Sequence, residues 1–463
     1  MDPVRSEQGA RPTQFLPWRQ LLLISAYWLG ISAIWGGYEQ FGQKQLELMV
    51  GRGSVGTVMS LLELAGGIVA ILVVPTVGTL SDYTVSRWGK RKGYIISGAV
   101  LDLVFLTGLA LVAIPEPKGW DGAALGSVPL MAAYVVCFLS LQFSSNLAQG
   151  PFQGYVPDLV PEPQVGIASG SMGVMRLTGQ LFGTAVMLVG AATNQWGLPL
   201  VIIGIVEVAL ATATFLWVRE GPVARDRQGR RWSAIAKEAW GTDVLHEHSF
   251  LAMTGVRLFF LMGVGIFVNI SLLYVERSLG QTDPGLRSTW QYAAVVLLAI
   301  GTVAAALPSG WISDRIGRKP VIYAAIALAA IGLAILAAAP EPIWAMPGAL
   351  ILGMGSGAYL SVDWALMTEV IPLAASGRYM GLANIANSIS GPIGLIFGGV
   401  LMDLMTRTGH YPEGPRVAVT VGIVALGFAA LLLRAVRPKR DPRALGDSRP
   451  TGADRHARPT GAM

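Results

Sequence analysis

Long apolar stretches alternate with short polar ones along the whole chain. Twelve of the apolar stretches approach the length of about 20 residues that a helix needs to cross a bilayer. A backbone in hydrocarbon has to satisfy its own hydrogen bonds, so each stretch is predicted to form a helix. The apolar cores span 21–38, 55–77, 94–114, 128–149, 167–191, 198–218, 250–273, 292–312, 321–339, 343–366, 380–402 and 417–436. The pattern predicts an all-α membrane protein with twelve transmembrane helices.

Composition strengthens this prediction. Of the 463 residues, 53% are hydrophobic and 13% are charged, whereas soluble proteins carry about 25% charged residues. Such a chain cannot cover a large core with polar side chains, so its surface is expected to face the lipid bilayer. The net charge of +6 does not indicate nucleic-acid binding, because the basic residues lie between apolar stretches and form no basic domain. The single cysteine, Cys137, allows no disulfide within the chain.

Lysine and arginine are distributed unequally between the two sides of the predicted membrane. Segments on the side of the N-terminus contain 25 of them, the opposite loops contain 7, and two lie within helices, at Arg176 and Arg257. Because loops rich in Lys and Arg stay in the cytoplasm, both termini are predicted to be cytoplasmic. We expect a multi-pass protein of the cell membrane.

The longest internal polar segment divides the chain six helices from six. We predict an N-terminal cytoplasmic tail over 1–17, an N-terminal six-helix bundle over 18–218, a cytoplasmic linker over 219–248, a C-terminal six-helix bundle over 249–437 and a basic, disordered tail over 438–463. Apolar residues recur at helical spacing within the linker and predict a short helix in the membrane interface: Trp232, Ile235, Ala236, Ala239 and Trp240.

A charged motif occurs twice. The segment "GTLSDYTVSRWGKRKGYI" (78–95) is matched by "GWISDRIGRKPVI" (310–322) at Gly, at Ser-Asp and at the basic cluster. Both copies follow the second helix of a six-helix half, and 232 residues separate Asp82 from Asp314. An internal duplication of this kind is typical of transporters that are built from two similar bundles around a central site.

The two copies carry a resemblance to the major facilitator superfamily, whose loop motif reads G-x-x-x-D-x-x-G-R-[KR]. The C-terminal copy fits closely, and the N-terminal copy is stretched to Ser81-Asp82-x-x-x-Ser86-Arg87-x-Gly89-Lys90-Arg91. The longer form resembles the sucrose-transporter-like and glycoside–cation symporter branch, as does "NLAQGP" (146–151). The resemblance implies two pseudo-symmetric six-helix bundles, alternating access and secondary transport of a small polar organic solute, with a sugar or glycoside favoured.

We interpret the repeated motif as a latch between the two bundles. Gly78 and Gly310 allow close helix approach, and Asp82 and Asp314 lie where each can cap the N-terminus of a helix of the opposite half. Such contacts would favour the outward-facing state and break when the cytoplasmic side opens. The alternative is that these charges only fix the topology. The candidate gating residues are Gly78, Asp82, Arg87, Gly89, Lys90, Arg91, Gly310, Asp314, Arg315, Gly317, Arg318 and Lys319.

Ionisable side chains inside a membrane cost roughly 3 kcal/mol or more each, so those within the predicted helices are candidates for function. They are Glu39, Glu63, Asp102, Arg176, Glu207, Arg257 and Asp363. The resemblance implies that helices 1, 4, 7 and 10 line the cavity and that helices 3, 6, 9 and 12 form a scaffold. Asp102 and Glu207, on helices 3 and 6, are therefore interpreted as structural or interfacial.

Depth in the membrane pairs some of these residues. At 1.5 Å per residue, Arg257 and Asp363 lie about 10 and 12 Å from the same face, which predicts an ion pair unless each extends separately to the interface. Arg176 lies near mid-membrane, where Glu63 or Glu207 would be its partner. The candidates for coupling or ion pairing are Glu39, Glu63, Arg176, Arg257 and Asp363.

A polar strip on helix 4 is the candidate substrate site. Its amides recur at the spacing of one helix face, and helices 7 and 10 offer further polar and aromatic groups. Amides for hydroxyls and aromatic rings for sugar faces suit a polyol-like ligand, although the amides could equally bond neighbouring helices. The candidate cavity residues are Gln142, Asn146, Gln149, Asn269, Tyr359, Asp363 and Trp364.

One departure from the resembling branch affects coupling. Its sucrose–proton symporters carry an aspartate in helix 4 where this chain has Gln142, and an arginine near the start of helix 5 that falls near Gly166 here. Either the coupling carboxylate moved to Glu39, Glu63 or Asp363, or the protein is uncoupled, or its substrate is not a disaccharide. Sodium coupling is disfavoured because helix 2 has one carboxylate and the core of helix 4 has none.

Enzymatic function is not indicated. The four histidines fall in predicted loops or the tail, no cluster of Cys, His and carboxylates forms a metal site, and no phosphate-binding loop occurs. We therefore expect no catalytic residues and no cofactor, a proton gradient as the energy source, and a monomer that binds a small-molecule substrate. The alternatives are an exporter of another organic molecule and a non-transporting assembly or pigment-delivery factor of the same fold.

Overall fold

The computed structural model describes residues 15–161, 164–220, 229, 231–234, 247–370, 383 and 385–437. The N-terminal half contains α1 (Trp18–Val50), α2 (Val55–Asp82), α3 (Lys92–Leu111), α4 (Val128–Gln153), α5 (Tyr155–Leu159), α6 (Val165–Thr193) and α7 (Gly197–Trp217). The C-terminal half contains α9 (His248–Leu273), the π-helical turn η4 (Tyr274–Ser278), α10 (Pro284–Ile316), α11 (Arg318–Ala338), α12 (Pro342–Val370), α14 (Ile385–Arg407) and α15 (Gly414–Ala435).

Twelve helices in the described part of the chain are long and apolar enough to cross a membrane. This confirms the predicted fold class and helix count. Several helices continue beyond their predicted apolar cores. The largest difference is in α1, whose core was expected to end at 38 and which continues to Val50. The extension carries polar residues that are buried between the two halves, and this burial, rather than apolar sequence, makes it part of the helix.

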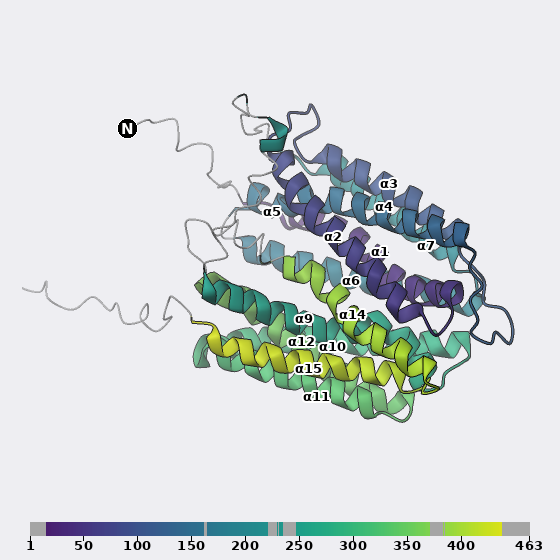
Figure 1. Cartoon of the computed structure of the whole chain (residues 1–463). Helices are drawn as coiled ribbons and strands as arrows, with labels where there is room; N and C mark the ends of the chain where they lie inside the picture. The colour runs from purple at the N-terminus through teal and green to yellow at the C-terminus, as the bar shows by residue number, and fades with distance from the viewer. Residues whose placement is uncertain are drawn as a thin grey trace, which may run out of the picture.

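The helices form two bundles that lie one above the other in Figure 1. Within the first, α1 packs along α6 and α7, and α4 packs along α2 and α3; within the second, α12 packs along α10 and α11, and α15 packs along α9. The bundles meet chiefly where α2 lies beside α14 and where α6 lies beside α10. We call the end that carries the repeated motif the motif end, and the end where α1 passes into α2 the far end.

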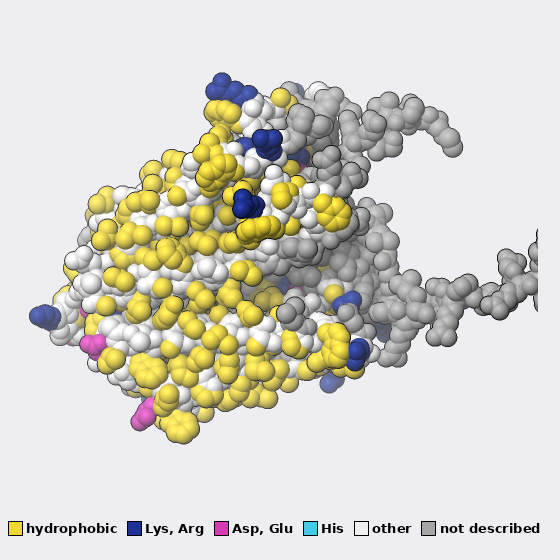
Figure 2. Space-filling model, turned by 180° about the vertical axis from the view of Figure 1, so that it is seen from behind, with side chains coloured by type: hydrophobic (Ala, Val, Ile, Leu, Met, Phe, Trp, Pro, Cys, Tyr) yellow, Lys and Arg dark blue, Asp and Glu magenta, His cyan; other side chains and the backbone are white. Residues whose placement is uncertain are grey.

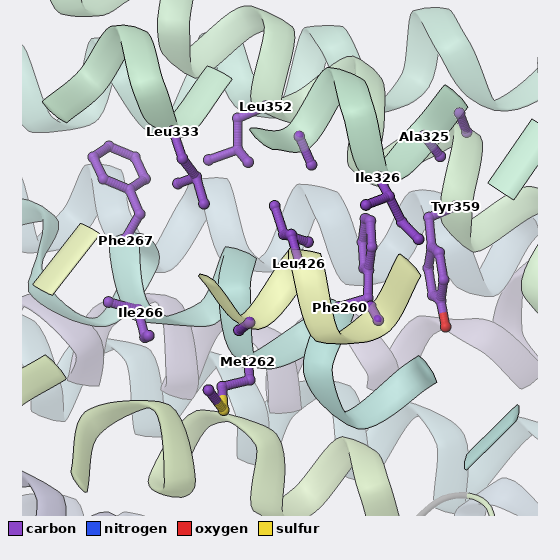
Figure 3. Packing of buried hydrophobic residues seen from close by; sticks show 14 of the residues in the cluster. Phe260, Met262, Ile266, Phe267, Ala325, Ile326, Leu333, Leu352, Tyr359 and Leu426 are labelled. Carbon is purple, nitrogen blue, oxygen red and sulfur yellow. The ribbon is translucent and has the colours of Figure 1, made fainter. Parts of the chain in front are cut away.

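Small residues allow the closest helix contacts. A Cβ atom on Gly183 of α6 would lie 2.0 Å from the carbonyl oxygen of Ala33 of α1, and one on Gly179 would lie 2.2 Å from that of Leu29. Such distances exclude any side chain. In the second bundle, Phe260 and Tyr359 stack with ring centroids 3.8 Å apart, within the apolar core that Figure 3 shows.

The outer surface along the helices is apolar. Figure 2 shows hydrophobic side chains covering this face of both bundles, with the visible Lys, Arg, Asp and Glu residues near the two ends. Large side chains well inside the helices, such as Val104, Val136 and Leu431, are exposed. A water-exposed surface of this extent would be unfavourable, so the distribution fits a protein surrounded by lipid. The predicted interfacial helix and C-terminal tail lie largely or wholly outside the described residues, and the predicted domain boundaries stay predictions.

Candidate functional site

Two acidic side chains of the first bundle face each other near its centre. Glu39 of α1 and Glu63 of α2 are both half-buried, and their carboxyl groups are close enough to interact electrostatically. The side-chain amide of Gln180 on α6 donates to Glu39 Oε2 at 3.5 Å. Three helices therefore contribute polar groups to one accessible region, which we call the central polar site.

The amide strip of α4 lies against α2. Asn146 Nδ2 donates to the backbone carbonyl of Gln142 at 2.6 Å and to its Oε1 at 3.3 Å, so the predicted shared face is present. Gln142 packs on Gly66, where a Cβ atom would lie 2.7 Å from Gln142 Nε2. Both amides are buried, whereas Gln149 is half-buried. The hydrogen bonds run within one helix, not between helices.

Arg176 of α6 does not have the carboxylate partner that its depth led us to expect. Among the described residues it forms no ion pair, and its guanidinium lies 4.7 Å from the ring centroid of Trp28. Glu207, one expected partner, instead accepts a hydrogen bond from Tyr27 at 2.8 Å. The ring of Trp28 provides an aromatic face that can stabilise the charge of Arg176 in place of a carboxylate.

In the second bundle, the predicted contact between Arg257 and Asp363 is present as an ion pair. The Tyr359 hydroxyl donates to Asp363 Oδ1 at 2.9 Å, and all three residues are buried. Because Tyr359 and Asp363 are buried and bonded inside the bundle, this conformation does not open either residue to a ligand. Their role in lining a cavity stays a prediction. The side chain of Trp364 lies outside the described residues.

Asn269 of α9 faces α14 within the second bundle. It is half-buried, donates to the Gly265 carbonyl at 2.8 Å, and its Nδ2 is 3.6 Å from the position that a Cβ atom on Gly391 of α14 would take. Its other capacity for hydrogen bonding is available to a ligand, so its assignment to the cavity stays a prediction.

The N-terminal copy of the motif is satisfied within its own bundle. Arg91 Nη2 lies 2.6 Å from Asp82 and 2.9 Å from Asp158, and Lys90 contacts both carboxylates at 3.9 and 2.7 Å. Among the described residues, Asp82 therefore forms its ion pairs within its own bundle. The latch was expected to break when the motif end opens, and in this conformation the bundles are joined at the far end, so its role stays a prediction.

Neighbouring residues fix the loop of this motif. Gly89 adopts a φ of +117°, and its Cβ position would collide with Glu220, whose Oε2 accepts from the backbone N–H of Arg91 at 3.0 Å. Tyr155 donates to the other Glu220 oxygen at 2.6 Å, and burial together with Glu220 raises the pKa of that phenol. Arg87 lies 4.8 Å from the ring centroid of Trp88.

The C-terminal copy repeats one local contact. Ser313 donates to the Gly310 carbonyl at 2.7 Å, as Ser81 donates to that of Gly78. Farther along the copy, Gly317 has a φ of +95° and Lys319 Nζ donates to the carbonyl of Val436 at 2.9 Å. The guanidinium of Arg315 lies 3.6 Å from the Trp311 ring centroid, and Arg318 is the first residue of α11. The side chain of Asp314 lies outside the described residues.

The sequence reasoning missed a charged network at the far end. Glu47 of α1 and Arg277 of η4 form an ion pair at 2.6 Å and are both inaccessible to solvent. Lys44 contacts Glu47 at 3.1 Å, Glu116 at 3.0 Å and Glu276 at 3.4 Å. Arg287 completes the network with contacts of 2.5 Å to Glu276 and 3.4 Å to Glu116. The network joins the two bundles.

A second contact closes the same end. The backbone N–H groups of Gly56 and Thr57, at the start of α2, donate to Asp403 of α14 at 3.0 and 2.7 Å, and the Thr57 hydroxyl donates at 2.7 Å. The cap of α2 is thus supplied by the other bundle, since its own Ser54 makes no side-chain cap. The backbones approach closely here, because a Cβ atom on Gly56 would lie 2.2 Å from the carbonyl oxygen of Gly399.

These features define the class of protein: two six-helix membrane bundles that carry a repeated motif, are joined at one end, and hold ionisable and amide groups inside the membrane-spanning helices. The chain belongs to the Major Facilitator Superfamily, whose family model matches residues 21–395 and 288–459. Membership of this family indicates a transporter rather than an enzyme, and its twelve-helix fold is that of a multi-pass membrane protein.

Similar proteins include several transporters. The chain is 30% identical over 143 residues to the sucrose transport protein SUT1 of Oryza sativa subsp. japonica, a match that covers 30% of this chain and 26% of that protein. It is 32% identical over 131 residues to a probable inositol transporter 2 of Arabidopsis thaliana, covering 26% and 22%. The matched regions thus span about a quarter of the length of these relatives.

Solved structures show the same fold. The structure of a D-xylose-proton symporter has a TM-score of 0.63 at 17% identity and covers 89% of this chain and 96% of its own. The nucleoside transporter NupG has a TM-score of 0.63 at 14% identity and covers 90% and 98%. At these identities the likeness concerns the fold alone.

Proposed function

We propose that this protein is a secondary active transporter of a small polar organic solute, with a sugar or glycoside favoured, that works by alternating access and is driven by protons. The observation that carries the proposal is the pair of half-buried carboxyl groups, Glu39 and Glu63, beside the amides of α4 and α6 in bundles joined at the far end. The proposed setting is the cell membrane with both termini in the cytoplasm, as the bias in Lys and Arg indicates.

The substrate class follows from the chemistry of the central polar site and from the relatives. Amide groups both donate and accept hydrogen bonds, as sugar hydroxyls do. Gln180 of this site is accessible enough to offer them, and so are the candidate cavity residues Gln149 and Asn269. Sucrose, inositol and D-xylose, which appear in the names of similar proteins, are all polyhydroxylated. These facts support a polyol-like solute over an ionic or apolar one.

Proton coupling is assigned to Glu39 and Glu63. Two neighbouring carboxylates in a poorly solvated site repel each other, and binding one proton relieves that repulsion. Asp363, the third candidate from the sequence, is already neutralised by Arg257 and bonded by Tyr359. A proton on Asp363 would neutralise the carboxylate that Arg257 contacts and weaken this buried ion pair, so Asp363 is the poorer proton carrier.

Uptake into proteoliposomes tests the proposal. Purified protein is reconstituted, a pH gradient is imposed, and accumulation of labelled sucrose, xylose, inositol and a nucleoside is followed with and without a protonophore. We expect one sugar or polyol to accumulate only while the gradient lasts. Glu39→Gln and Glu63→Gln should abolish accumulation while leaving exchange of labelled for unlabelled solute.

The matched control is Glu341→Gln, an exposed carboxylate that precedes α12. It should accumulate solute as the wild type does. If both cavity variants accumulate solute normally, the coupling assignment is wrong. A ligand at 100 times its Kd stabilises the folded protein by about 2.7 kcal/mol, so binding is also measurable as a rise in the thermal unfolding midpoint. If none of the four solutes is transported and none raises this midpoint, the assignment of a polyol-like substrate is wrong.

A further inference from the structure

Two carboxyl groups are buried side by side in the scaffold of the first bundle, away from the central polar site. Asp102 of α3 and Glu207 of α7 are both inaccessible to solvent. Helix α3 packs along α7, and the two carboxyl groups are close enough to interact electrostatically. Carboxylates only accept hydrogen bonds, so the two groups can bond to each other only when one of them carries a proton. We call these two residues the acid pair.

The surroundings of the acid pair supply hydroxyl groups rather than cations. Tyr27 of α1 donates to Glu207 Oε1 at 2.8 Å, and Ser144 of α4 donates to Asp102 Oδ1. In the described part of the chain, neither carboxyl forms an ion pair with Lys, Arg or His, and the charged or titratable groups that act on them are each other and Tyr27. No counter-charge compensates for their burial.

One oxygen on each carboxyl group has no hydrogen-bond donor among the described residues. These buried oxygens are Asp102 Oδ2 and Glu207 Oε2. An unpaired buried charge costs several kcal/mol, and two adjacent like charges cost more. A single proton placed between the two groups supplies the missing donor and removes one charge; a second proton removes the other. The missing hydrogen-bond donor and the uncompensated negative charge are therefore both supplied by a bound proton.

We propose that Asp102 and Glu207 form a proton-binding site that holds at least one proton through neutral pH and that this proton is not transported. The pair links four helices, because Asp102 of α3 accepts from Ser144 of α4 and Glu207 of α7 accepts from Tyr27 of α1. Helix α1 packs directly onto the pair, since a Cβ atom on Gly30 would lie 2.9 Å from Glu207 Cγ. The bound proton acts as a structural cofactor of the first bundle. The inference does not depend on the proposed substrate or coupling residues.

Stability should depend on pH with a definite sign. The folded bundle holds a proton that the separated carboxyl groups would release at neutral pH, so the unfolding equilibrium is favoured as pH rises, by about tenfold per pH unit for one proton. The unfolding midpoint of the wild type in nanodiscs should fall between pH 6 and pH 9. The double variant Asp102→Asn/Glu207→Gln is neutral at every pH, keeps the shapes of both side chains and should lose that part of the slope.

Infrared spectroscopy reads the proton directly. The wild-type spectrum at neutral pH, minus that of the double variant, should contain the C=O band of a protonated carboxylic acid, and this band should shift in D₂O. The control Glu341→Gln should leave both the band and the slope unchanged. A wild-type spectrum with no protonated carboxylic acid at neutral pH would overturn the proposal without requiring any variant to fold.

The number of protons moved per solute separates a held proton from a transported one. We expect the double variant to transport protons and solute in the wild-type ratio. A changed ratio would overturn the statement that the proton is not transported. An unchanged acid band and an unchanged pH slope in a folded double variant would refute the site itself, whether or not the protein proves to transport sugars.

Discussion

Lys44 of the first bundle and Glu276 of the second contact each other at 3.4 Å, and the 232 residues between them equal the separation of Asp82 and Asp314 in the repeated motif. The two residues therefore occupy equivalent positions in the duplicated halves. The same position has acquired opposite charges in the two copies. Residues at equivalent positions of the two halves can come into contact at the pseudo-symmetry axis. Here the contact of Lys44 with Glu276 helps to join the two bundles at the far end.

The cap that Asp403 provides for α2 should stabilise the conformation that is closed at the far end. Asp403→Asn removes the charge that meets the positive end of the helix and weakens two N–H contacts, at a cost of about 1–2 kcal/mol. Because the contact crosses between bundles, the loss should increase the fraction open at the far end by about 5- to 30-fold. Distances between spin labels on Leu125 and Leu286, exposed residues of opposite bundles at this end, would report it.

The matched control for that cap is Asp283→Asn. Asp283 Oδ1 accepts from the N–H of Leu286 at 2.8 Å and caps α10 of its own bundle. The substitution is the same, and no contact between bundles is lost. If Asp283→Asn and Asp403→Asn opened the far end equally, the cap that Asp403 provides for α2 would not be what keeps the far end closed.

The ion pair of Glu47 and Arg277 should behave as a contact specific to the closed state. Removing one partner of a buried pair costs about 3–5 kcal/mol, because the other charge stays buried. Glu47→Gln alone should therefore open the far end strongly, and Glu47→Leu combined with Arg277→Met should recover most of the closure. The same spin-label distances measure both.

Arg257→Met provides the comparison within one bundle. It breaks a buried pair of the same type, with Asp363, and should lower the thermal unfolding midpoint without changing the distance across the far end. If Arg257→Met opened the far end as much as Glu47→Gln does, Glu47 and Arg277 could not be the specific contact that keeps the far end closed.

Close backbone approach at the far end predicts a steric effect. A Cβ atom on Gly399 would lie 2.6 Å from the carbonyl oxygen of Gly56, so Gly399→Leu should separate α2 from α14 and prevent closure. Gly427→Leu on α15 is the matched control, because its Cβ atom would meet nothing within 4 Å. Crosslinking between cysteines placed on α2 and α14 should be lost in the first variant and kept in the second.

At the motif end, Arg91 should stabilise the first bundle alone. Arg91→Met leaves Asp82 and Asp158 without their guanidinium partner, and because both carboxylates are partly solvated, a loss of about 1–3 kcal/mol is expected. Arg87→Met removes a neighbouring arginine that contacts only Trp88 among the described residues, and should leave the unfolding midpoint nearly unchanged. Similar midpoints for the two variants would disprove the role of Arg91.

The central polar site was partly predictable. Glu39, Glu63 and the strip of Gln142 and Asn146 were found because an ionisable or amide group within an apolar helix is costly and stands out in the sequence. Gln180 was missed, since a single glutamine next to small residues has no such signal. What brings it to Glu39 is the contact of α6 with α1, which depends on glycines that the sequence shows only as candidates for packing.

By itself, the sequence determined the properties that depend on local composition and on helix geometry. Twelve apolar stretches gave the helices, the repeated motif gave the two halves, and equal depth predicted the contact of Arg257 with Asp363. Only the tertiary structure decided which charges meet between the bundles. Lys44, Glu47 and Arg277 were assigned to loops or passed over, because a polar continuation of an apolar helix is recognisable only when its partners are in place. The partners of Asp82 likewise depend on which end of the protein is closed. The sequence determines which residues are charged, but the conformation determines which of these residues come into contact.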